Sequence, residues 1–166
     1  LEKDLASVNY QSASMDEVTN RMNEILKKNV EASSVNVYIL SNQNELETAY
    51  SSNKLSMKMP VNNPIFDTLL NNNRNVVIAQ QIEKDHAVSA ITKELTEFFE
   101  TTKSDALFIL NEGHNIFGLI TLGKKASGDH YKEYDYNVFT KLYSYFFVFG
   151  YYMRNISNKD IIDVVN

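Results

Sequence analysis

The most informative absence in this sequence is cysteine, which does not occur among its 166 residues. A chain without cysteine forms no disulfide, no thiolate metal site, no cysteine nucleophile and no thioether link to a cofactor. Glycine is also scarce, with five residues that all lie between Gly113 and Gly150 and at least five positions apart, whereas a phosphate-binding loop needs several glycines at one helix start. No nucleophile elbow or paired carboxylate motif is present. We therefore expect a protein that is not an enzyme.

Clustered positive charge and long apolar runs are missing as well. The formal net charge is −5 and the basic residues are scattered, whereas nucleic-acid binding relies on clustered cations that displace counterions from phosphates. No apolar run approaches the roughly 20 residues of a membrane-spanning helix, and the first residues lack the charged-then-apolar order of a signal peptide. The three histidines have no metal-ligand spacing. These absences predict a cytoplasmic chain that contacts neither nucleic acid nor membrane and holds no metal.

What is present is enough apolar sequence for one core. Apolar residues make up 43% of the chain, aromatic residues 11% and charged residues 22%, which are proportions of a soluble globular domain. The length fits a single domain. We expect an N-terminal helical extension or linker over residues 1–13, a domain over 14–156, and a tail or linker to an output domain over 157–166. Because the sequence opens without methionine, we expect a domain excised from a longer protein.

Helical spacing of apolar residues predicts four main helices. Ser14 and Glu17 form a capping box at the start of the first helix. Asn63 is a favourable N-cap before Pro64 at the first helical position of the second. The expected helices cover residues 15–32, 64–70, 83–101 and 133–156.

Runs rich in β-branched and aromatic residues predict the strands. They are expected at residues 34–41, 45–50, 55–59, 76–79, 106–110 and 116–123. Short polar turns join two pairs of these strands as hairpins, and a segment containing helices connects the pairs. This order predicts an α+β fold with a mainly antiparallel sheet of about six strands, the terminal helices on one face and the crossover helices on the other.

The stretch from Asn115 to Ile156 resembles the GAF domain, a sensory module of phosphodiesterases, phytochromes and many bacterial signalling proteins. Its sequence Phe-Gly-Leu-Ile-Thr-Leu-Gly at residues 117–123 resembles a late strand of that family. The loop with Ser127-Gly128, Tyr131 and Asp135 resembles the one that follows it in GAF domains of bacterial histidine kinases. The resemblance implies a six-stranded antiparallel sheet, terminal helices that usually form a dimer interface, and a small-molecule pocket on the other face.

Several chemistries of that family can be tested on residues. Members that attach a bilin or reduce methionine sulfoxide use cysteine, so both activities are excluded here. The Asn-Lys-Phe-Asp-Glu signature of phosphodiesterase cyclic-nucleotide sites is also missing, which weakens the case for a cyclic nucleotide. The sequence therefore leaves the ligand and any cofactor unknown.

Alternation along the strands predicts which side chains face a pocket. Tyr38 lies opposite the helix-facing set in its strand, and Leu119 and Thr121 lie opposite Ile120. Tyr38 and Thr121 are the most informative pair, because a sealed core would prefer no polar group there. The alternative is a simply packed core. The candidate pocket residues are Tyr38, Leu40, Phe66, Leu70, Ile91, Leu95, Phe108, Leu119 and Thr121.

The aromatic final helix predicts a dimer surface. Its 4-3-4-3-4 apolar spacing makes one continuous seam, and a second stripe of Phe139, Phe146 and Met153 lies on an adjacent face. One face could pack on the sheet of this chain and the other on a second copy, although burial of the whole helix on its own sheet is the alternative. The candidate interface residues are Met15, Val18, Met22, Val138, Leu142, Tyr145, Phe149, Tyr152 and Ile156.

These patterns lead to one preferred hypothesis and two others. The preferred hypothesis is a non-enzymatic sensory or regulatory domain of a bacterial signalling protein, which binds a small molecule, forms a homodimer and signals to an output domain beyond Asn166 in the same longer chain. The second is a ligand-free dimerisation scaffold with a packed core. An enzyme of unrecognised mechanism is the weakest, because it would need converging carboxylates or histidines in a cavity.

Overall fold

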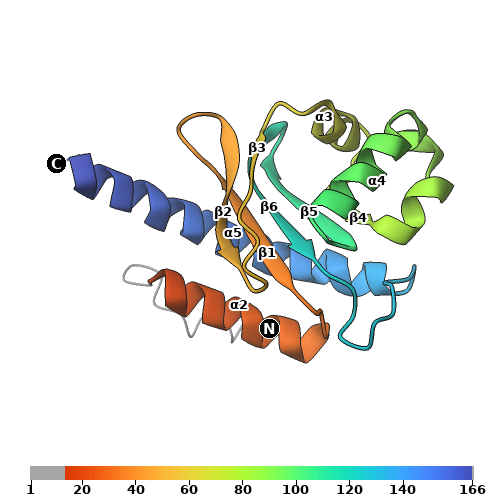
Figure 1. Ribbon diagram of the computed structural model, residues 1–166, viewed down its shortest axis with the longest axis horizontal. Coiled ribbons are helices and arrows are strands. Elements are labelled where there is room, and N and C mark those ends of the chain that lie inside the picture. The colour runs from red at the N-terminus through yellow and green to blue at the C-terminus, as the bar shows by residue number, and fades with distance from the viewer. Residues whose placement is uncertain (1–13, 166) are drawn as a thin grey trace.

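A six-stranded sheet forms the centre of the protein (Figure 1). The computed structural model describes the backbone of residues 14–165 and the side chains of residues 14–157. The strand order is β3-β2-β1-β6-β5-β4, and every neighbouring pair is antiparallel. The α+β fold predicted from the sequence is confirmed. The strands are β1 (Val35–Leu40), β2 (Glu45–Ser51), β3 (Lys58–Pro60), β4 (Val76–Ile78), β5 (Ala106–Glu112) and β6 (Asn115–Leu122).

Helices cover both faces of this sheet (Figure 1). The terminal helices α2 (Met15–Asn29) and α5 (Asp135–Val165) pack together on one face. The crossover helices α3 (Pro64–Asn71) and α4 (Thr92–Thr101) cover the other. The predicted N-caps are confirmed, because Ser14 accepts a hydrogen bond from the backbone N–H of Glu17, which is the serine half of the predicted capping box, and Asn63 accepts one from Ile65. Among the helices that the structure describes, none is long and apolar enough to cross a membrane.

The crossover segment differs from the helix predicted over residues 83–101. Two 3₁₀ helices, η1 (Ala79–Lys84) and η2 (His86–Ile91), precede α4 and meet at Asp85. Asp85 has an extended backbone, with φ −94° and ψ 98°, and its carboxylate accepts the N–H of Ala87. Such a capping bond competes with a continuous helix. Val88 interrupts the helical backbone again, with φ −115° and ψ 19°, and α4 begins at Thr92. The strand predicted at 55–59 was also misplaced, since β3 is confined to Lys58–Pro60.

The last helix starts later and ends later than predicted. It begins at Asp135, whose carboxylate accepts the N–H of Lys132 over 2.8 Å. It continues to Val165, so residues 157–165, expected as a tail or linker, are helical. Their role as a linker stays a prediction. The extension expected at residues 1–13 lies outside the described residues.

Two apolar cores lie on the two faces of the sheet. On the face covered by α2 and α5, the Phe108 ring contacts the rings of Phe139 and Phe146, with centroid distances of 5.3 and 4.7 Å. Phe108 was predicted to line a pocket on the opposite face, and that prediction is wrong. The register pairs Phe108 with Ile120, and directly opposed residues share a face of the sheet. Ile120 faces the terminal helices as predicted.

The terminal helices bury most of the predicted dimer seam within this chain. Because α2 lies beside α5, both helices turn their apolar stripes onto the same core. Residues in that core are not available to a second copy, so this part of the predicted interface is wrong. The buried members are Val18, Met22, Leu142, Tyr145 and Phe149, whereas Met15, Val138, Tyr152 and Ile156 are half-buried.

Candidate functional site

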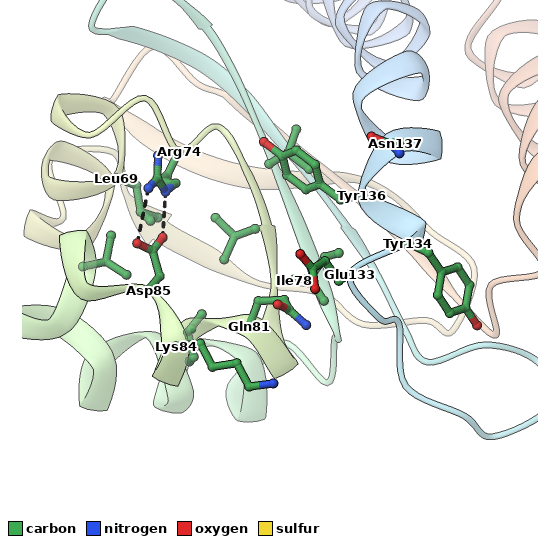
Figure 2. A pocket seen from close by; sticks show the side chains of 14 residues that line it. Leu69, Arg74, Ile78, Gln81, Lys84, Asp85, Glu133, Tyr134, Tyr136 and Asn137 are labelled. Carbon is green, nitrogen blue, oxygen red and sulfur yellow. Dashed lines mark hydrogen bonds and ion pairs between the residues drawn. The ribbon is translucent and has the colours of Figure 1, made fainter.

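A cleft of about 930 Å³ opens to solvent at the β4 edge of the sheet (Figure 2). Its floor is β4, one wall is η1 with η2, and the other wall is the start of α5. None of the nine residues predicted to line a pocket is among its lining residues. The sequence pattern missed this site because the cleft lies beside the sheet, whereas alternation along strands reports only on the two faces.

The floor of the cleft is apolar because β4 lies at the edge of the sheet and consists of three buried aliphatic residues. Its residues Val76, Val77 and Ile78 are buried, yet the strand pairs with β5 on one side only. The chain leaves the sheet directly after Ile78 and turns back in η1 and η2, which bring Ile82 and Val88 against the same floor. The cleft therefore combines an apolar base with polar walls, as small-molecule sites commonly do.

An ion pair shapes the crossover wall. Arg74 Nε lies 2.6 Å from Asp85 Oδ2, Nη2 lies 3.3 Å from Oδ1, and Nη1 donates to the carbonyl of Asn72 over 2.8 Å. The hydrogen bonds from Arg74 hold the pKa of the Asp85 carboxyl below its ordinary value, against the opposing effect of desolvation. The ionised carboxylate ties the junction of η1 and η2 to the end of α3. The two charges also neutralise each other.

The α5 wall contributes Glu133 and Tyr136. Figure 2 shows both side chains directed into the cleft, and Gln81 lines the opposite wall. Tyr134 points away (Figure 2), because its hydroxyl accepts a hydrogen bond from Lys125 Nζ over 3.2 Å. No described residue gives the side chains of Glu133, Gln81 or Lys84 a hydrogen bond or ion pair. These three polar groups are therefore available to a ligand.

Buried hydrogen bonds anchor the loop that carries this wall. Asp105 accepts the backbone N–H of Tyr131 over 3.1 Å and lies 3.0 Å from Nδ1 of His130. The Tyr131 hydroxyl donates to the carbonyl of Gly123 over 2.6 Å. Burial, and then the charge of Asp105, raise the pKa of Tyr131, so this hydroxyl remains a donor. The entry to α5 is thereby fixed to the sheet two residues before Glu133.

Most of the predicted pocket residues form the second core instead. Phe66, Leu70, Ile91, Leu95 and Leu119 are buried in the core between the sheet and the crossover segment, and Leu40 is half-buried beside them. They are brought together on the predicted face, but as packed side chains. Among the described residues, no group of three or more His, Cys, Asp or Glu side chains could hold a metal.

The polar residues predicted on that face are buried there. Tyr38 and Thr121 are fully buried, and Asn36, which the prediction missed, lies directly opposite Thr121. Tyr38 OH, Thr121 Oγ1 and Asn36 Oδ1 have no hydrogen-bond partner within the described part of the chain. Burial raises the pKa of Tyr38, and the nearby Thr121 hydroxyl lowers it by less without completing a well-formed bond. Their role in ligand binding stays a prediction.

Comparison with solved structures identifies proteins that share this fold. No family model matches the sequence, and no curated protein matches it either. A GAF domain/HD domain protein from Geobacter sulfurreducens is similar over 92% of this chain and 98% of its own, with TM-score 0.54 and 12% identity. The GAF domain of a two-component sensor histidine kinase from Bacillus halodurans is similar over 90% and 98%, with TM-score 0.52 and 13% identity.

A third similar structure covers residues 122 to 287 of a methyl-accepting chemotaxis protein. The similarity spans 90% of this chain and 93% of that one, with TM-score 0.51 and 11% identity. At these identities the likeness is one of fold. The chain has the fold of GAF domains from bacterial sensor proteins, and the resemblance predicted from the sequence is confirmed at that level.

Proposed function

We propose that this chain is a non-enzymatic, cytoplasmic sensory domain of a bacterial signalling protein and that the cleft beside β4 binds a small molecule. One observation carries the proposal. The cleft joins the crossover segment to the first turn of α5, and α5 runs from there past the sheet to the C-terminal end (Figure 1). A ligand that bridges the two walls would therefore act directly on the helix that leaves the domain.

The length and the anchoring of α5 support a proposal of signal transfer along this helix. The helix has 31 residues and is about 46 Å long at 1.5 Å per residue. A ligand shifts an equilibrium only by binding one arrangement better than another. Contacts between the ligand and both Gln81 and Glu133 would favour the arrangement that holds the walls together. We propose that this change reaches an output domain in the same longer chain.

We also propose that the domain forms a homodimer through its terminal helices. The partly exposed apolar residues of α5 support a surface that is narrower than the predicted seam. In a two-fold symmetric homodimer, the same surface patch of each copy contacts its partner, so the patch must be self-complementary. A ligand-free dimerisation scaffold is the second candidate, and the dense packing of the residues predicted to form a pocket favours it.

Thermal unfolding in the presence of a metabolite collection separates the two candidates. A ligand that binds only the folded state raises the melting temperature. We expect at least one small molecule to do so, and Gln81→Trp to abolish the shift because the bulkier indole on the η1 wall obstructs a ligand that contacts both walls. Gln80→Trp, at the exposed neighbouring position of η1, is the matched control and should preserve it.

Two results would count against the sensor. One is a collection of nucleotides, amines, amino acids and organic acids that leaves the melting temperature unchanged. The other is a shift that survives Gln81→Trp, which would move the binding site away from this cleft.

A further inference from the structure

The unpaired charges of the cleft identify the chemistry of its ligand. We propose that the cleft binds a small molecule that carries a primary ammonium group on an apolar aliphatic body, with Glu133 as the partner of the ammonium. This inference rests on the proposed function of the cleft and adds the ligand class. Four charged side chains line the cleft: Arg74, Lys84, Asp85 and Glu133.

The first step is that the Arg74 guanidinium is already occupied. It contacts both oxygens of Asp85 and the carbonyl of Asn72. Lys84 is consequently the single unpaired cation among the lining residues that the structure describes. Phosphate groups are usually held by several cations or by a row of backbone N–H groups. A single unpaired lysine is therefore expected to give nucleotides and other polyanions only weak binding in this cleft.

The second step is that Glu133 is an unpaired anion directed into the cleft. Figure 2 shows Glu133 directed into the cleft on the same wall as Tyr136, and Gln81 lines the cleft from the η1 wall. A primary ammonium has three donors and no acceptor. It can donate to the Glu133 carboxylate and to the Gln81 carbonyl oxygen while its charge lies near the Tyr136 ring. Tyr134 is not a second partner for the ligand ammonium, because Lys125 Nζ already contacts its hydroxyl and its ring.

The third step concerns the rest of the ligand. The floor offers Val76, Ile78, Ile82 and Val88, which are all buried, so the body attached to the ammonium should be aliphatic. The volume of about 930 Å³ lies in the range of small-molecule pockets. Lys84, on the wall opposite Glu133, could pair with a carboxylate. A simple amine and an amino acid therefore share the ammonium chemistry and differ in their need for Lys84.

Isothermal titration calorimetry on the full chain, with three six-carbon probes, tests the proposal. The probes are n-hexylamine, L-norleucine and hexanoate, which share an aliphatic body and differ in charge. We expect hexylamine, norleucine or both to bind, and hexanoate not to bind. Glu133→Gln should raise the Kd of the binding amine by roughly tenfold or more, because a charge-assisted hydrogen bond is lost. Glu112→Gln, an exposed carboxylate at the far end of β5, is the control.

Lys84→Met distinguishes the two sources of the ammonium. Weaker norleucine binding with unchanged hexylamine binding would identify an amino acid, whereas an effect on neither probe would identify a simple amine. The proposal is overturned if neither amine binds, if hexanoate binds as well as they do, or if Glu133→Gln, folded by circular dichroism, leaves the Kd unchanged. If the metabolite collection meanwhile yields a ligand of another class, the sensory function stands and only the ligand class falls.

Discussion

Three buried hydroxyl groups in this protein have opposite energetic roles. The Tyr131 hydroxyl donates a short hydrogen bond to the Gly123 carbonyl, whereas those of Tyr38 and Thr121 lack a partner among the described residues. A net intramolecular hydrogen bond stabilises a protein by about 1 kcal/mol, and a buried polar group left without one costs about 1–3 kcal/mol. The Tyr131 hydroxyl therefore stabilises the entry to α5, whereas the unpaired hydroxyls of Tyr38 and Thr121 reduce the stability of the packing on the opposite face of the sheet.

Removing these hydroxyls one at a time should change stability in opposite directions. Tyr131→Phe leaves the Gly123 carbonyl unpaired and should lower the free energy of unfolding by about 1–3 kcal/mol. Thr121→Val keeps the shape, removes an unpaired oxygen, and should leave stability unchanged or raise it by up to about 1 kcal/mol. Urea unfolding followed by circular dichroism measures both. A loss in Thr121→Val as large as that in Tyr131→Phe would show that the Thr121 hydroxyl is satisfied after all.

At this scale, alternation within a strand predicted side-chain direction only where polar and apolar residues alternate. Tyr38 was placed correctly because it interrupts the apolar set of β1. Phe108 was placed wrongly because residues 106–110 are all apolar, and such a run has no period to read. Its direction is set by pairing with Ile120, which is a contact between strands. The same alternation places Asn36 on the face of Tyr38, whereas its position opposite Thr121 depends on the pairing of β1 with β6.

Among the elements, the crossover segment departs most from its prediction. The apolar spacing over residues 83–101 fits one helix, yet Asp85 divides it by bonding to Ala87 and Arg74. Arg74 lies eleven positions earlier in the chain, so no local pattern contains this contact. The same division produces the 3₁₀ turns that form a wall of the cleft. A candidate site could therefore not be inferred from helical periodicity alone.

The charge on Asp85 predicts a pH dependence of stability. Because its folded pKa is lowered, chiefly by Arg74, its contribution is present above the unfolded value of about 3.9 and is lost as the pH falls through the folded value. Asp85→Asn should therefore destabilise the protein at pH 7, by about 1 kcal/mol or less since Arg74 is 40% exposed. Below the folded pKa the variant and the parent should be equally stable.

Urea titrations at pH 7, 5 and 2.5 would follow this difference, with Glu97→Gln on the exposed side of α4 as the control. A difference between Asp85→Asn and the parent that stays constant down to pH 2.5 would exclude the charge as its cause. It would point instead to the geometry of the cap at Ala87.

For the whole molecule, the layers were predictable and the surfaces were not. Terminal helices on one face and crossover helices on the other follow from the order of elements. How much of α5 the core covers depends on α2 lying beside it, and a single helical pattern does not show its neighbour. A negative charge at Tyr145 or Phe149 would therefore disrupt the core of one chain before it reported on any dimer.

The proposed dimer is better tested on the side of α5 that faces solvent. Val148 is half-buried and the side chain of Tyr151 is 41% exposed. The double variant Val148→Glu, Tyr151→Glu should be folded and sediment as a monomer, because it places like charges against each other across a symmetric contact. Lys93→Glu on α4, in the opposite layer, should leave the sedimentation mass of the parent unchanged. A double variant that still sediments as a dimer would remove this surface from the proposal.

The position of the cleft also bears on how quickly such a domain could respond. A ligand enclosed between a sheet and its covering helices leaves only when the core opens, and such local unfolding is slow and costly. The cleft beside β4 is reached from solvent while both cores remain packed. Ligand exchange there would be governed by diffusion and by affinity. The occupancy of the cleft would therefore follow a changing ligand concentration without any local unfolding of the core.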